Sequence, residues 1–287
     1  MNDIPDNSVS GAFAQNYSAI EWAKAYPFDV PGRSYVYCRG EAHFLDDFTL
    51  QNWRSARINR AGSSAVLSDV LDTAELAALE QPRHAVVACG SNAAPRRLAQ
   101  KFRHVHDVVP TLRVTLENYC IVYSAKFSAY GSIPATLVRV PGACVTTFVN
   151  LLTDQQLRVM DETETLGVAY DRPVLEDATV RGMDGAPPHD GFSPLSAYVS
   201  RSGALCIEGV ALALDTVEGS AVPFQKYSQE KVQSLVKDLL NAGDSVDNFI
   251  EQNLNDPVLR NDRAAKLQRN WAVRYDVPLP VNPRVRR

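Results

Sequence analysis

The segment from residue 84 to residue 102 places the tightest constraint on the fold. Residues 84–89, His-Ala-Val-Val-Ala-Cys, form a short apolar run that predicts a buried strand. The run stops at Gly90-Ser91-Asn92, and Pro95, a residue suited to a first helical turn, opens a helical stretch through Phe102. A strand, a turn and a helix in immediate succession indicate a mixed α and β fold.

Further strands are predicted on the C-terminal side of this segment. Thr111 to Lys126 contains a long run of β-type residues. Two more strands, Ala135 to Val140 and Cys144 to Leu151, are separated by Pro141-Gly142, which is typical of a hairpin turn. Later strands fit Pro173 to Glu176, Ser196 to Ser200 and Leu205 to Leu214.

The two ends of the chain differ from this middle. Trp22, Tyr26 and Phe28 need a core to bury against, so the N-terminal part is expected to pack on the middle. Near the other end, Val232, Leu235, Val236, Leu239 and Leu240 follow the spacing of one buried helix face, and a second such face starts with Val246, Phe249 and Ile250. We therefore predict an α+β fold with an N-terminal extension (1–81), a central domain (82–215) and C-terminal helices and tail (216–287).

Composition narrows the class of protein. The chain is 45% hydrophobic and 22% charged, ordinary values for a globular protein, and its net charge of −4 argues against a nucleic-acid coat. No stretch approaches the roughly 20 apolar residues that span a bilayer, and the start does not resemble a signal peptide. Five widely spaced cysteines without a C-x-x-C pair suit a reducing compartment. We expect a cytoplasmic protein with no nucleic-acid or membrane partner; the oligomeric state is left open.

The stretch Thr153 to Thr165 is the first candidate for chemistry. Thr153 and Gln156 form a capping-box pattern that predicts a helix start. Leu157, Met160 and Glu164 then share one face, whereas Glu162 points away. Partial burial and the helix dipole should disfavour the ionised form of Glu164 and suit it to proton exchange near neutral pH. A solvated acidic helix end is the alternative interpretation.

The turn at Gly90-Ser91-Asn92 is the second candidate. Backbone N–H groups exposed between a strand and a helix can cradle a carboxylate or a phosphate, although Gly, Ser and Asn also make ordinary structural turns. Cys89 beside those amides is either a nucleophile or a small core residue. His104 and His106 would share a strand face but lack the third ligand that a metal site needs, so no metal and no cofactor are predicted.

Taken together and in this order, these two pieces resemble the γ-glutamylcyclotransferase-like superfamily over about residues 82–200. Its small members show Tyr-Gly-Ser-Asn after the first strand and a later Leu-Asp-x-x-Glu. Cys89-Gly90-Ser91-Asn92 and Met160-Asp161-Glu162-Thr163-Glu164 match them here. Pro134-Ala135-Thr136 and the strand from Asn118 to Tyr123 resemble two further family strands.

The resemblance implies a small, mixed β-barrel with surrounding helices, and an enzyme of lyase or acyltransferase type. Its substrate would be a small molecule, a γ-glutamyl or related amide, whose own amine attacks the γ-carbonyl and releases 5-oxoproline and a free amine. Glu164 would be the general acid/base, and Cys89, Gly90, Ser91 and Asn92 would form the substrate-binding turn. Tyr170 and Tyr198 fall where the family tends to place tyrosines and would be further substrate contacts.

The sequence departs from the family at two positions. Cys89 replaces the turn tyrosine, which removes one hydroxyl, and Thr165 replaces the glycine that often follows the glutamate. Two other functions therefore stay open: an amide hydrolase on the same fold, in which water attacks, and a non-catalytic small-molecule-binding module. The leaving group, the choice between cyclisation and hydrolysis, and the role of residues 1–81 are not determined by the sequence.

Overall fold

A computed structural model describes residues 16–60, 63–102, 108–183, 192–243 and 245–274, together with the backbone of 284–285. The helices of these residues are α1 (Ala19–Lys24), α2 (Thr73–Leu79), α3 (Pro95–Lys101), α4 (Asp154–Thr163), α5 (Gln229–Leu239), α6 (Val246–Asn255) and α7 (Pro257–Trp271). Short 3₁₀ turns are η1 (Trp53–Ser55), η2 (Leu67–Asp69) and η3 (Ser91–Ala93). His104 and His106, for which no metal site was predicted, lie outside the described residues.

The strands carry most of the fold. They are β1 (Tyr35–Cys38), β2 (Glu41–Asp47), β3 (Arg57–Arg60), β4 (Ser63–Val66), β5 (His84–Ala88), β6 (Val108–Tyr123), β7 (Ala135–Leu152), β8 (Tyr170–Asp171), β9 (Thr179–Gly182), β10 (Leu195–Ala197), β11 (Val199–Ser200), β12 (Ala204–Ile207), β13 (Val210–Ala211), β14 (Ala213–Leu214), β15 (Gly219–Ser220), β16 (Lys226–Tyr227), β17 (Ala272–Arg274) and β18 (Arg284–Val285). In the predicted strand Pro173 to Glu176 the structure has one isolated bridge, between Val174 and Ser196.

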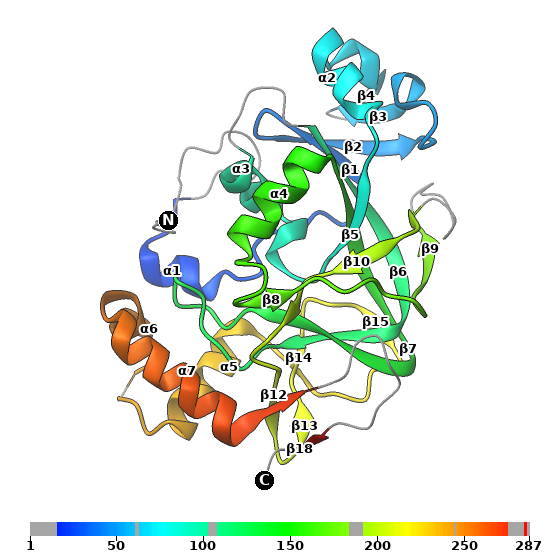
Figure 1. The fold of residues 1–287 in the computed structure, drawn as a ribbon. Helices are drawn as coiled ribbons and strands as arrows, with labels where there is room; N and C mark the ends of the chain where they lie inside the picture. The colour runs from blue at the N-terminus through cyan, green and yellow to red at the C-terminus, as the bar shows by residue number, and fades with distance from the viewer. Residues whose placement is uncertain are drawn as a thin grey trace.

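One large sheet organises the molecule (Figure 1). Its strand order is β10-β5-β7-β6-β1-β2-β3-β4, with β9, β14, β15 and β16 attached beside this path. The pairing is antiparallel except for β10 with β5 and β14 with β16. The helices beside this mostly antiparallel sheet confirm the predicted α+β class. The predicted barrel is wrong for the described residues, because the path has two open ends, at β10 and β4.

The two longest strands correct one prediction from sequence. Pro141-Gly142 does not form a hairpin turn, because Ala135 to Leu152 run as the single strand β7 and pair with β6 on both sides of it. The register shifts between Glu117 and Tyr119, where Asn118 has a φ of 68° and Gly142 a φ of 84°. The Gly142 N–H donates to Asn118 Oδ1 at 3.0 Å. Pro141 and Gly142 therefore mark a bulge, which bends the strand pair without ending it.

The C-terminal region differs from the sequence prediction in its number of helices. α5 carries the first predicted face, with Val232 and Val236 fully buried. The second face belongs to α6, which ends at Asn255, and a third helix, α7, begins at Pro257. Asp256 caps α7 by accepting from the N–H groups of Val258 and Leu259, at 3.0 and 2.9 Å. Among the described residues, no helix is both long and apolar enough to cross a membrane.

The N-terminal residues are part of the same core. β1 to β4 extend the sheet from β6, and β1 pairs with β6 from Tyr35–Thr111 to Cys38–Val108. α1 begins at a capping box made by Ser18 and Glu21, and it places Trp22 in the core with 0% exposure. The Trp22 ring lies 4.4 Å from that of Phe28 and 6.4 Å from that of Tyr130 between centroids.

We predict that Trp22→Ala lowers the free energy of unfolding by about 3–5 kcal/mol, because it removes a fully buried indole. Urea denaturation would measure this loss. Val258→Ala is the control, since Val258 is 79% exposed and its truncation should change stability by less than about 0.5 kcal/mol. If Trp22→Ala were as stable as that control, residues 16–30 would not contribute to the core.

Candidate active site

The turn after β5 is held from three strands. Cys89 and Gly90 follow β5 and lead through η3 to α3. The Tyr35 hydroxyl of β1 donates to the Ala93 carbonyl at 2.7 Å, and Asn150 Nδ2 of β7 donates to the Asn92 carbonyl at 3.0 Å. Thr111 of β6 fixes Asn150 in turn, by donating from Oγ1 to its Oδ1 at 3.0 Å. The turn is therefore anchored to the sheet by side chains of β1, β6 and β7.

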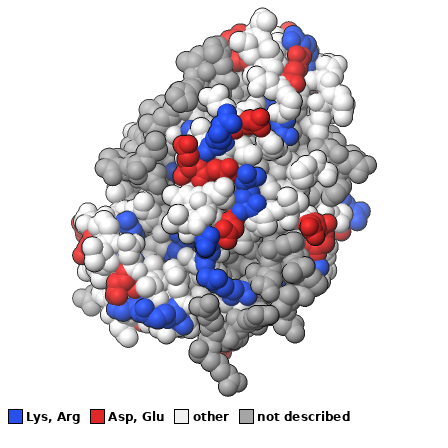
Figure 2. Space-filling model, in the orientation of Figure 1, with Lys and Arg blue, Asp and Glu red and all other residues white. Residues whose placement is uncertain are grey.

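The helix that carries Glu164 forms as the sequence predicts. Thr153 is the N-cap of α4, and its side chain forms the predicted capping box with Gln156. Leu157 and Met160 are buried, and Glu164 is the C-cap residue on the same face. On the outward side of this region, acidic and basic side chains are interleaved (Figure 2). Thr165, which stands where the γ-glutamylcyclotransferase-like pattern often has glycine, has a φ of 50°, a conformation that glycine adopts more easily.

The two predicted motifs meet at the Glu164 carboxylate. Its side chain is 16% exposed, and Oε1 accepts from Asn92 Nδ2 at 3.1 Å. The same oxygen accepts from Lys101 Nζ at 2.5 Å, and the Lys101 side chain is only 3% exposed. Because Lys101 ends α3 and Asn92 lies in the turn before it, the carboxylate is tied to both ends of one short segment.

The charge state of Glu164 corrects the sequence prediction. Burial is the largest single influence and raises the pKa of this carboxyl. The Lys101 ammonium, the Asn92 amide and the Arg97 guanidinium act in the opposite direction and together outweigh burial, so the pKa lies below its ordinary value of 4.5. Glu164 is therefore a carboxylate paired with Lys101, and the direction of its pKa shift is opposite to the one that burial and the helix dipole predicted.

Two further cations act on this carboxylate. Arg97 favours its ionised form, and Glu164 favours the charged form of Lys126. Burial has the larger effect on Lys126 and lowers its pKa, and its Nζ lies 4.6 Å from the centre of the Tyr170 ring. Three cations, Lys101, Arg97 and Lys126, thus interact with the single negative charge of Glu164.

Two tyrosine hydroxyls flank Ala135 in the interior beside Glu164. The Ala135 N–H donates to the Tyr26 hydroxyl at 2.7 Å, and the Tyr170 hydroxyl lies 3.5 Å from the Ala135 carbonyl. Glu164 contributes to raising the pKa of both phenols, after burial, which is the main cause. Tyr170 thus interacts with Glu164. Glu164 also contributes, after burial and Asp161, to raising the pKa of Tyr198, whose hydroxyl donates to Asp161 Oδ1 at 2.6 Å, and Arg172 pairs with the same Asp161 carboxylate.

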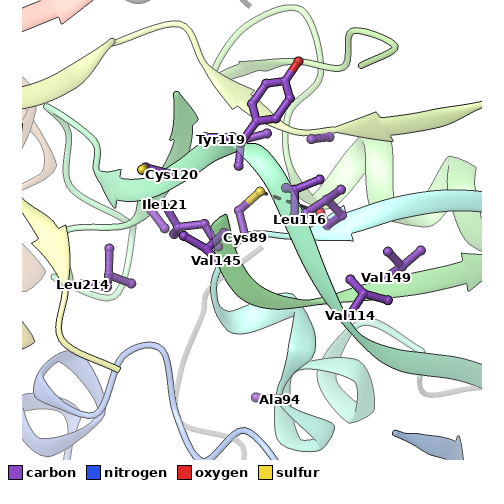
Figure 3. Packing of buried hydrophobic residues seen from close by; sticks show 14 of the residues in the cluster. Cys89, Ala94, Val114, Leu116, Tyr119, Cys120, Ile121, Val145, Val149 and Leu214 are labelled. Carbon is purple, nitrogen blue, oxygen red and sulfur yellow. Dashed lines mark hydrogen bonds between the residues drawn. The ribbon is translucent and has the colours of Figure 1, made fainter. Parts of the chain in front are cut away.

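Cys89 is a core residue in this structure. Its thiol points among apolar side chains that include Leu116, Ile121 and Val145 (Figure 3). Burial raises the pKa of the thiol to about 12, with Glu164 adding to the effect. The alternative in which the turn amides activate Cys89 as a thiolate nucleophile is therefore contradicted.

A hollow of about 310 Å³ lies at the same turn, bordered by Cys89, Gly90 and Ala93. Glu164 does not line it. The rest of its wall is mainly apolar with hydroxyl groups and one carboxylate, from Pro27, Phe28, Asp29, Val30, Ala88, Ile121, Thr146, Thr147, Phe148, Leu214, Thr216 and Val217. Gly90 thus borders this hollow, and it also contacts Tyr26.

Sequence reasoning missed four residues of this site: Tyr26, Arg97, Lys101 and Lys126. A signal for two of them was present, because Arg97 and Lys101 are four apart on the predicted helix and so share a face. Nothing local marked Tyr26 or Lys126. Within the described residues no group of three His, Cys, Asp or Glu side chains could hold a metal ion.

We predict that Lys101→Met raises the pKa of Glu164 above that in the unmodified protein, since burial remains while the closest cation is lost. Titration of the glutamate side-chain carboxyl carbons by NMR would measure the shift. Lys266→Met, at a half-exposed lysine paired with Asp262, is the matched control and should leave the Glu164 pKa unchanged. An unchanged pKa in Lys101→Met would contradict the buried pair.

Acid stability provides a second test of the same pair. A carboxyl whose folded-state pKa is lowered contributes stability above its unfolded pKa, and this contribution is lost as pH falls through the folded value. As the pH is lowered below about 5, the free energy of unfolding should therefore decrease less steeply in Glu164→Gln than in the unmodified protein. Urea denaturation of both proteins over a pH series would measure the difference. A parallel pH dependence in the two proteins would show that Glu164 is not selectively stabilised as a carboxylate.

Some solved structures are similar to parts of this chain. No family model matches the chain, and no curated protein matches it. A solved γ-glutamyl cyclotransferase is 13% identical with a TM-score of 0.33, over 64% of this chain and 99% of that one. An uncharacterised Homo sapiens protein is 11% identical with a TM-score of 0.34, over 69% and 95%. An Arabidopsis thaliana protein is 22% identical with a TM-score of 0.31, over 42% and 63%. Each of these structures is similar to part of this chain.

Proposed function

We propose that this chain is a γ-glutamylcyclotransferase-like enzyme, which cleaves a γ-glutamyl or related amide into 5-oxoproline and a free amine. The observation that carries the proposal is the contact of Glu164 with Asn92 of the turn, inside a largely buried and positively charged site. A paired carboxylate in such surroundings is a common feature of functional sites, because its charge state depends on what is bound beside it.

The charges fit the head of a γ-glutamyl substrate. That group carries an α-ammonium and an α-carboxylate on one carbon. Glu164 is the acceptor for the ammonium, while Arg97 and Lys126 supply positive charge for the carboxylate. Such charge pairing in a site with little water is stronger than at an exposed surface.

Lys101 is the cation that pairs with Glu164 in the structure. A substrate ammonium that reaches Glu164 Oε1 competes with Lys101 Nζ for the same oxygen. The exchange replaces one ammonium on this oxygen by another, so Glu164 stays a carboxylate while the substrate binds. The ammonium that it now holds carries the proton that ring closure has to remove, so the carboxylate is placed to accept it.

The reaction balances with one carboxyl as carrier. Glu164 accepts a proton from the α-ammonium, and the freed amine attacks the γ-carbonyl carbon. The new C–N bond closes the ring, and the bond from the γ-carbon to the leaving nitrogen breaks. In all, the ring nitrogen gives up two protons and the leaving nitrogen gains two. Because nucleophile and carbonyl belong to one molecule, ring closure avoids the entropy cost of bringing in water.

The hollow beside Gly90 guides the choice of substrates. Its wall is mainly apolar with three threonine side chains, so it suits an uncharged leaving group better than an acidic one. A test panel should therefore include γ-glutamyl amides with aliphatic, aromatic, hydroxylated and acidic leaving groups.

We predict that the purified protein releases 5-oxoproline from at least one of these amides and that Glu164→Gln lowers kcat/KM by about 10²–10⁴-fold, the usual range for a general acid/base. Chromatography of the products measures the release. Glu162→Gln is the matched control, since Glu162 lies on the exposed side of the same helix and its change should leave kcat/KM within about threefold.

Three results would contradict the proposal in different ways. Free glutamate in place of 5-oxoproline would indicate hydrolysis by water. Thermal stabilisation by a γ-glutamyl ligand without turnover would indicate a binding module. Full activity in Glu164→Gln would remove this carboxyl from the chemistry.

A further inference from the structure

We propose that Tyr26, from the segment that precedes the sheet, is a substrate-contacting residue whose hydroxyl donates a hydrogen bond to an oxygen of the bound glutamyl group. The inference rests on the proposed function and adds a residue to its site. Neither spacing nor composition marked this tyrosine as functional.

The first observation is the close approach of Tyr26 to the turn. A side-chain carbon placed on Gly90 would lie 2.1 Å from the Tyr26 hydroxyl oxygen and 3.1 Å from the ring carbon that bears it. Glycine at position 90 is therefore what allows the hydroxyl to rest directly on the turn. The neighbouring residues Pro27 and Phe28 line the hollow on which Gly90 also borders.

The second observation is the bonding of the hydroxyl. It accepts from the Ala135 N–H at 2.7 Å, so its own hydrogen is still available for donation. Within the described part of the chain no acceptor receives that hydrogen. The hydrogens of Tyr35, Tyr119, Tyr123 and Tyr198 are all used, on Ala93, Asp177, Tyr227 and Asp161. A buried donor is costly to leave unused, so a ligand oxygen is a fitting partner.

The third observation is the surroundings of Tyr26. Burial raises the pKa of its phenol well above the usual range, and the negative charge of Glu164 adds to the effect, so the group stays protonated as a donor. The residue that precedes Gly90 on the strand is the thiol Cys89, which points into the core and is a weak donor. Tyr26 therefore supplies the hydroxyl that the turn itself lacks.

Tyr26→Phe tests this contact, because it removes one oxygen and keeps the ring. With the best substrate of the panel we expect kcat/KM to fall by about 10-fold to 10³-fold, the range for loss of one aligned donor. The dissociation constant of 5-oxoproline, measured by calorimetry, should rise in the same variant. Tyr123→Phe is the matched control, since it removes another buried hydroxyl that bonds to a backbone carbonyl, and its kcat/KM should stay within about threefold.

A probe that keeps the hydroxyl covers the case in which Tyr26→Phe does not fold. 3-Fluorotyrosine at position 26 should show a ¹⁹F chemical-shift change when 5-oxoproline is added, and the same label at position 123 should not. Unchanged kcat/KM and 5-oxoproline affinity in folded Tyr26→Phe, or an unmoved ¹⁹F signal at saturating 5-oxoproline, would overturn the inference and leave the proposed function standing. Absence of both turnover and 5-oxoproline binding in the unmodified protein would overturn both.

Discussion

The ion pair between Lys101 and Glu164 is the interaction on which the site depends. It joins the end of α3 to the end of α4, with side chains that are 3% and 16% exposed. An ion pair removed from water in this way gains little net stability, because desolvation of both charges offsets their attraction. The pair therefore matters less for stability than for the charge of the Glu164 carboxyl, whose pKa Lys101 lowers.

This pair depends on the position of the turn before α3, and side chains of the sheet hold that turn. Tyr35, Thr111 and Asn150 hold the carbonyls of Asn92 and Ala93 directly or through one another. These side chains come from β1, β6 and β7, which are adjacent strands in the sheet although Tyr35 and Asn150 lie far apart in the sequence. Since Tyr35 of β1 belongs to the N-terminal region, the position of the turn depends on residues that precede the predicted central domain of residues 82–215.

Local patterns predicted the parts of this site that local interactions determine. The capping box at Thr153 and the stripe of Leu157, Met160 and Glu164 follow from helix geometry, and the strand before Gly90 follows from its apolar run. The charge state of Glu164 could not be predicted in this way, because the deciding partner lies 63 residues earlier on another helix. Burial alone gave the wrong direction for its pKa. The bulge at Gly142 was equally hidden, since it requires Asn118 on the neighbouring strand.

The cations of α3 show why the N-terminal segment and the site form one unit. Arg96, Arg97 and Lys101 are all buried on a helix of seven residues, which isolated charges would not tolerate. Arg96 lies over the rings of Tyr17 and Trp22, at 5.1 and 5.5 Å from their centres, and Arg97 lies 5.3 Å from that of Tyr130. Aromatic faces offset part of the desolvation that these charges suffer. The rings of Tyr17 and Trp22 thus help a positive site to persist inside a chain of net charge −4, and the same segment places Tyr26 against Gly90.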